Sequence, residues 1–196
     1  MLKTIYDLRQ EFRHYANPDD LISRYTKQNR LIRLTKGWYE TDPDAEPIQF
    51  CSLFWQPSYL SFQSALAWYG MIPERVENIT CATTHARKKK VYDCPFGIFT
   101  YSDIPRTVFA YGLKYNTDYQ VPFLIATKEK ALCDLIYKQR KIPNQKEMRE
   151  FLLDDLRLEL EDLIGLDLKL INQLAPLYHS TNIQLFRKVL SKWIQH

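Results

Sequence analysis

The sequence contains few of the residues that phosphate-binding loops, disulfide-bonded scaffolds and membrane spans require. Only 5 of the 196 residues are glycine, and the Gly-rich phosphate-binding motifs are absent. None of the cysteines forms a C-x-x-C pair, which predicts reduced, partly buried thiols and no zinc site; they are Cys51, Cys81, Cys94 and Cys133. There is no apolar run of about 18 residues, so we expect no membrane association.

The first 15 residues also lack the charged and then apolar pattern of a secretory signal. We therefore expect a cytoplasmic protein. With 45% hydrophobic and 14% aromatic residues, a chain of this length buries about 70% of its unfolded surface. Its stability then requires neither a disulfide bond nor a metal, and we expect no cofactor.

Catalytic patterns are missing as well. The sequence contains no Walker, Rossmann, zinc-protease or nucleophile-elbow motif, and no Gly-Ser followed by paired aspartates, as a nucleotidyltransferase would have. The four histidines have no partner at metal-ligand spacing. The nearest approach to a nuclease-like cluster is Asp162, Asp167 and Lys169, which we interpret, like Asp154 and Asp155, as solvated helix charges. We predict no catalytic residue, no bound metal and no enzymatic activity.

The interval Leu21–Tyr39 contains no acidic residue but five basic ones. Asn17 and Pro18 are typical of a helix start, and Leu21, Ile22 and Tyr25 would face inward. A hairpin over 31–39 with a basic tip, here called the wing, follows this helix. Such a helix can reach base edges while the wing cations contact phosphates. The predicted DNA-binding residues are Ser23, Arg24, Lys27 and Arg30 on the helix and Arg33 and Lys36 on the wing.

The acidic, proline-containing segment Thr41–Pro47 predicts a linker between two modules. We expect an α+β protein with an abbreviated winged-helix-like module at 1–41 and a larger domain at 48–196 that folds alone. In the first module we expect a helix over 3–15 before the helix that starts at Pro18. For the second the expected elements are a helix over 61–70 capped by Ser61, strands at 78–83 and 91–101, a hairpin of 109–115 with 119–125, and helices after Thr127 and Asn144 and at the C-terminal end. Leu66 and Leu132 are expected in its core.

A second basic run, Arg87, Lys88, Lys89 and Lys90, lies between the two strands. A hairpin tip of this composition is most simply a solvated loop. Its functional interpretation is a second phosphate contact or a surface for an acidic partner.

Several segments resemble the AbiEi family of bacterial antitoxins. The resemblance is carried by Leu31–Tyr39, by Pro57–Leu66 with Tyr69–Glu74, by the turn Pro95–Gly97 and by Ile125–Leu135, in the same order over residues 17–138. It implies an N-terminal winged-helix DNA-binding domain and a C-terminal α/β antitoxin domain. It also implies repression of the protein's own operon and antagonism of a co-encoded nucleotidyltransferase toxin in a type IV, abortive-infection system.

The expected partners are therefore promoter DNA and the toxin. A small module buries little surface on DNA, so two copies on inverted half-sites are expected. Two alternatives stay open: an antitoxin or adaptor that acts by protein interaction alone, and a DNA-processing nuclease.

Overall fold

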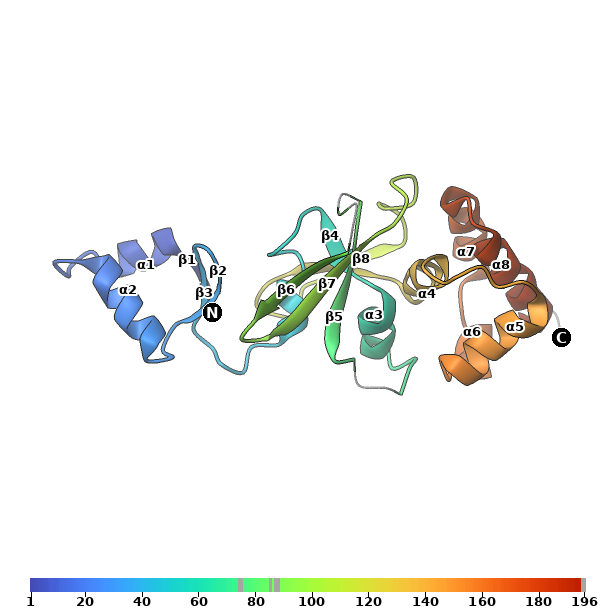
Figure 1. Ribbon diagram of the computed structural model, residues 1–196, viewed down its shortest axis with the longest axis horizontal. Coiled ribbons are helices and arrows are strands. Elements are labelled where there is room, and N and C mark those ends of the chain that lie inside the picture. Colours follow the sequence, from blue (N-terminus) through green and yellow to red (C-terminus); the bar gives the residue numbers. More distant parts are fainter. Residues whose placement is uncertain (74–75, 85, 87–88, 195–196) are drawn as a thin grey trace.

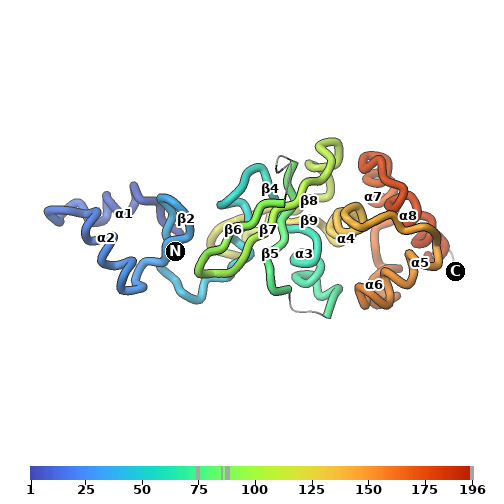
Figure 2. Tube along the Cα trace, in the orientation of Figure 1, coloured from blue at the N-terminus to red at the C-terminus, as the bar shows by residue number. Residues whose placement is uncertain are grey.

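The computed structural model describes residues 1–73, 76–84, 86 and 89–194. Three parts follow one another along its long axis: a small N-terminal module, a central sheet and a group of C-terminal helices (Figure 1, Figure 2). The protein is therefore of the predicted α+β class. Among the described residues, no helix combines the length and apolar character needed to cross a membrane.

The N-terminal module is a three-stranded antiparallel sheet with two helices. Its elements are β1 (Leu2–Thr4), α1 (Ile5–Glu11), α2 (Pro18–Lys27), β2 (Ile32–Thr35) and β3 (Trp38–Glu40), with strand order β1-β3-β2. Leu8, Ile22, Leu31 and Tyr39 form its core. The wing is present as β2 and β3, and two helices precede it rather than the three of a full winged helix.

The predicted helix over 3–15 is wrong at both ends. Leu2–Thr4 is a strand because it pairs with β3, a contact between distant residues that helical periodicity cannot reveal. Thr4 then caps α1: its hydroxyl accepts from the Asp7 amide at 3.1 Å, and the Asp7 carboxylate accepts from the Thr4 amide at 2.7 Å. This reciprocal pair is a capping box, and it places the helix start at Ile5.

The central sheet is mixed and six-stranded. It consists of β4 (Ser58–Leu60), β5 (Asn78–Thr83), β6 (Lys90–Cys94), β7 (Gly97–Asp103), β8 (Leu113–Asn116) and β9 (Phe123–Ala126), in the order β6-β7-β5-β4-β9-β8. The predicted strand at 91–101 is wrong, because the chain turns at Pro95 and Phe96 and makes two strands. The predicted second hairpin exists as β8 paired with β9, although residues 109–112 and 119–122 lie outside its strands.

Helices cover one face of this sheet and a loop covers the other. The helices α3 (Phe62–Trp68) and α4 (Lys128–Tyr137) contact β5 and β9 and pack on each other. Residues 47–57 cover the opposite face, where Phe54 lies 4.7 Å from Phe99 between ring centroids. As predicted, Leu66 and Leu132 are fully buried.

The C-terminal part of the chain after α4 is helical. Its elements are α5 (Gln145–Glu150), a π-helical turn (Phe151–Asp155), α6 (Leu160–Ile164), α7 (Leu168–Leu174), a 3₁₀ helix (Ala175–Tyr178) and α8 (Thr181–Ile194). Of these helices, α7 and α8 pack against α4, and α5 and α6 pack against α8. Asn144 caps α5 as predicted, because its side chain accepts from the Glu147 amide at 3.0 Å. The apolar face of α8 is buried, which confirms the sequence pattern.

The predicted linker contains no helix or strand between Thr41 and Glu46, but it is tied down. The Glu40 carboxylate accepts from the amides of Thr41 and Asp42 at 2.8 and 2.9 Å, and Ala45 is buried. Leu34 of β2 belongs to the larger core rather than to the N-terminal one. The boundary near 41–47 therefore separates two modules that share packing, and independent folding of 48–196 stays a prediction.

Candidate functional site

Three of the predicted DNA-binding residues share one exposed face of α2. Ser23, Arg24 and Lys27 are all exposed, whereas Leu21 and Ile22 are buried with 3% exposure each. At 100° per residue the three side chains fall within about a third of the helix circumference. They therefore project together, away from the module's core.

Arg30 leaves this face, contrary to the prediction. The helix ends at Lys27, and Asn29 adopts a left-handed conformation with φ of 55°. The Arg30 amide then donates to the Tyr25 carbonyl at 2.9 Å and the Asn29 amide to the Thr26 carbonyl at 3.1 Å, as in a Schellman motif. The Arg30 guanidinium lies 4.0 Å above the Tyr25 ring, on the side of α2 that faces α1.

The two wing cations are exposed on a hairpin that is fixed to the helices. Arg33 lies in β2 and Lys36 in the turn before Gly37. The Gly37 carbonyl accepts from the Ile5 amide at 2.8 Å, at the first turn of α1. This bond holds the tip of the wing against α1, so the wing and the helices form one unit.

Most acidic residues of the module form ion pairs or hydrogen bonds, whereas most of its exposed basic residues form no ion pair with a described residue. Residues 1–41 contain eight basic and five acidic residues, and so carry three of the four net positive charges. Arg9 donates to Asp19 at 2.8 and 2.9 Å and thereby lowers the pKa of that carboxyl, while Lys3 pairs with Glu11. Within the described residues no ion pair involves the other exposed cations of the module, which are Arg13, Arg24, Lys27, Arg30, Arg33 and Lys36.

The two described lysines of the predicted basic run at 87–90 lie on different faces of the sheet. Arg87 and Lys88 lie outside the described residues. Lys89 is exposed and lines a groove on the helix side of the sheet, whereas the Lys90 ammonium lies 5.4 Å from the Trp55 ring on the other side. Successive residues of an extended chain point to opposite faces, which explains the separation.

Sequence reasoning missed a buried polar centre in the larger domain. Its middle is the Asp134 carboxylate on α4, which accepts four hydrogen bonds. Lys130 Nζ donates at 2.5 Å and the Tyr178 hydroxyl at 2.6 Å to Oδ1, and the Ser61 and Tyr59 hydroxyls donate at 2.7 and 2.9 Å to Oδ2. Lys130 and Asp134 are both 0% exposed.

This centre joins the two longest segments that carry the family resemblance. Tyr59 and Ser61 lie in Pro57–Leu66, and Lys130 and Asp134 lie in Ile125–Leu135. The signal in the sequence was a lysine and an aspartate four residues apart, with only Ala131, Leu132 and Cys133 between them. That spacing places them side by side, but only the packing of β4 and Tyr178 over them shows that they are buried.

The sequence predicted that Ser61 caps α3, and this is wrong. The Ser61 hydroxyl donates to Asp134 instead and makes no cap hydrogen bond. The Thr80 hydroxyl of β5 takes that role and accepts from the Ser64 amide at 3.0 Å.

Gly112 lies close to Lys130 of the buried centre. Its φ is +66°, and a Cβ there would lie 2.9 Å from Lys130 Cβ.

The centre is closed to solvent, and its buried charges and hydroxyls have a structural role. Burial lowers the pKa of Lys130, and Asp134 opposes that shift; burial also raises the pKa of Tyr59 and Tyr178 well above the usual value. The two tyrosines therefore stay protonated and donate to Asp134. Since all five side chains are buried, the centre holds β4, α4 and the 175–178 turn together rather than meeting a ligand.

Asp167, one of the carboxylates considered for a nuclease-like cluster, has another role. Asp167 caps α7, with Oδ1 accepting from the amides of Lys169 and Leu170 at 2.8 and 3.2 Å. Within the part of the chain that the structure describes, no three His, Cys, Asp or Glu side chains are grouped closely enough to hold a metal ion. A comparison with models of known families and with curated proteins finds no match for this chain.

Proposed function

We propose that the protein is a DNA-binding antitoxin that represses its own operon and counteracts a nucleotidyltransferase toxin. The observation that carries the DNA-binding part is the set of four exposed cations without ion-pair partners on α2 and the wing: Arg24, Lys27, Arg33 and Lys36. Unpaired arginine and lysine on a rigid module can displace counterions from DNA without first breaking protein salt bridges.

The arrangement of α2 and the wing suits a duplex. The ten residues of α2 form a helix about 15 Å long and about 10–12 Å in diameter with its side chains, and this diameter fits a major groove about 12 Å wide. Arg24 and Lys27 on the exposed face would contact base edges or phosphates, and Arg33 and Lys36 the neighbouring backbone. The antitoxin part of the proposal relies on the family resemblance, whose two longest segments fold together around Asp134.

Binding should be measured by fluorescence anisotropy on DNA from upstream of the gene, over a range of salt concentrations. Four phosphate contacts predict a slope of log K against log salt near −3.6. Arg24→Ala or Lys27→Ala should weaken binding by about 1–3 kcal/mol if the residue reads a base. Lys188→Ala, which removes an exposed cation from α8, is the matched control and should leave binding unchanged. Binding that is indifferent to salt and to both α2 substitutions would refute the DNA interface.

A second experiment separates DNA binding from toxin antagonism. The full chain with Arg24→Ala and Lys27→Ala should lose promoter binding but still rescue growth when it is co-expressed with the cognate toxin from a foreign promoter. This result would assign antagonism to the larger domain. If the wild-type chain rescues growth but binds no promoter DNA, the protein acts as an interaction-only antitoxin.

A further inference from the structure

The sheet extends beyond the two helices that cover it, and this leaves a polar groove. Strand β5 contacts α3, whereas β7 is the next strand toward the β6 edge of the sheet. The groove has a volume of about 470 Å³, within the range of about 300–1,000 Å³ typical of small-molecule sites. Its walls include Gln63 of α3 and Lys138 and Gln139 at the end of α4.

The floor of the groove is a row of polar side chains on one face of the sheet. The parallel register sets Thr80 beside Thr100 and Ala82 beside Ser102, so all four residues face the helices. Thr100 is only 6% exposed, and its hydroxyl has no hydrogen-bond partner within the described residues. The side chains of Ser102, Asn78 and Gln63 also line the groove, and they too have no hydrogen-bond partner within the described residues.

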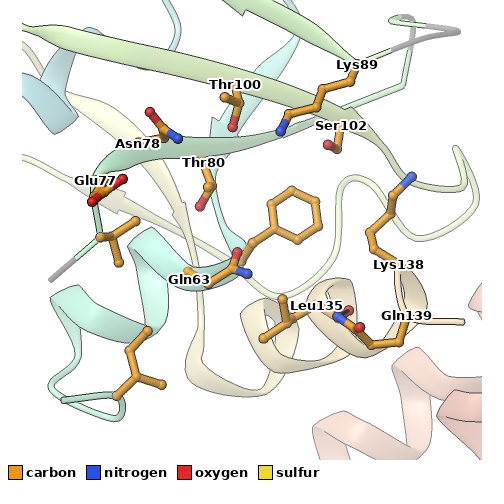
Figure 3. Close-up of a pocket in the computed structure, with 13 residues that line it drawn as sticks. Gln63, Glu77, Asn78, Thr80, Lys89, Thr100, Ser102, Leu135, Lys138 and Gln139 are labelled. Atoms are coloured by element: carbon orange, nitrogen blue, oxygen red, sulfur yellow. Dashed lines mark hydrogen bonds between the residues drawn. The ribbon is translucent and has the colours of Figure 1, made fainter. Parts of the chain in front are cut away.

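Two lysines line one end of this floor. Lys90 pairs with Tyr101, so the preceding Lys89 lies level with Ser102. From the other wall, Lys138 Nζ donates to the carbonyl of Asp103, the residue after Ser102, at 3.4 Å. Figure 3 shows both ammonium groups near Ser102, while Glu77 and Asn78 lie toward the opposite end.

We propose that this groove binds a nucleoside 5′-monophosphate, with the phosphate between Lys89 and Lys138. Two ammonium groups and the Ser102 and Thr100 hydroxyls match the charge and the acceptor oxygens of a phosphomonoester. At the other end, Glu77 accepts hydrogen bonds and the amides of Asn78 and Gln63 both donate and accept. That end matches the hydroxyls of a ribose and the polar edge of a base. The site is separate from α2 and does not depend on DNA binding.

The test is calorimetric titration of the full chain with the four nucleoside 5′-monophosphates, with nucleosides, ribose 5-phosphate and inorganic phosphate as comparison ligands. At least one monophosphate should bind saturably and about tenfold or more tighter than its nucleoside, as expected for lost charge-assisted bonds. Lys89→Gln and Lys138→Gln should each weaken that binding about tenfold. Lys90→Gln is the matched control, because Lys90 lies on the other face, and it should leave binding unchanged.

Three outcomes would overturn the proposal. The first is the absence of saturable binding for every monophosphate. The second is an equal loss of affinity in Lys90→Gln, which would indicate a nonspecific charge effect. The third is inorganic phosphate or ribose 5-phosphate binding as tightly as any nucleotide, which would exclude recognition of the base. Repeating the titration with Arg24→Ala and Lys27→Ala separates this site from the DNA interface, because that variant should bind the nucleotide normally.

Discussion

The helices α2 and α4 are each ten residues long and each begins at a capping side chain, yet they use their charges in opposite ways. Helix α2 buries two residues and exposes Arg24 and Lys27, whereas α4 buries seven, among them Lys130 and Asp134. The difference arises from what lies around each helix. Helix α2 has α1 and the wing on one side only, while the sheet, α3, α7 and α8 contact α4.

The comparison shows that a lysine in a helix has no fixed role. An exposed lysine without an ion-pair partner stays hydrated and therefore lowers the stability of the fold little. It is also available to an anionic partner. A buried lysine must be paired, because leaving one charge of a buried pair alone costs several kcal/mol. The four predictions below test this contrast, beginning with the largest effect.

Asp134→Ala should give the largest loss, about 3–5 kcal/mol of unfolding free energy, because it leaves the buried Lys130 and three hydroxyl donors without their acceptor. Urea denaturation measures it. The matched control is Glu150→Ala, which breaks the exposed Lys146–Glu150 pair at the same four-residue spacing and should cost at most about 0.5 kcal/mol. Equal effects in the two variants would show that burial does not distinguish the two pairs.

Leu132→Ala should cost about 2–5 kcal/mol, because it leaves a cavity on the fully buried side of α4. The thermal melt of the purified protein provides the measurement. Leu153→Ala removes the same atoms from a side chain that is 36% exposed and should cost clearly less. A melting temperature unchanged by Leu132→Ala would contradict the assignment of the core.

Asp134→Asn should make stability rise with pH. The substitution removes the carboxylate charge that raises the pKa of Lys130. Burial is then no longer opposed by Asp134 and lowers the pKa of Lys130 further. At pH values between the native and the unfolded pKa, Lys130 is neutral in the folded variant and protonated in the unfolded chain. Unfolding therefore takes up a proton. The unfolding free energy of the variant should therefore increase by up to about 1.4 kcal/mol per pH unit, between the lowered pKa and the unfolded value. Urea melts at pH 7, 8 and 9, compared with the wild type, test this; a parallel pH dependence of both proteins would contradict it.

Lys27→Ala should have the smallest effect on stability, within about 0.5 kcal/mol, because the side chain is exposed and unpaired. The same variant is expected to weaken promoter binding. Arg30→Ala provides a contrast, because it removes the guanidinium that lies over Tyr25 and should cost about 0.5–1 kcal/mol at this exposed site. A large stability loss in Lys27→Ala would mean that this residue is part of the fold rather than of a free surface.

Short-range patterns allowed much of the fold to be predicted. The start of α2 at Asn17, the wing around Gly37, the cap at Asn144 and the apolar face of α8 all depend on residues within a few positions of one another. The two errors have different causes. Strand β1 exists through its long-range pairing with β3, whereas the division of 91–101 into β6 and β7 follows from a local signal, the turn at Pro95 and Phe96, which the alternation of apolar residues does not reveal.

The sequence by itself determined the basic face of α2, because Arg24 and Lys27 follow from helical spacing alone. It could not place Arg30, whose direction is set by the turn at Asn29. Only the tertiary structure decided that Lys130 and Asp134 are buried and that Lys89 and Lys138 line the same groove as Ser102. The physical reason is that spacing along a chain fixes which side of an element a charge occupies, whereas its burial and partners depend on elements folded from distant residues.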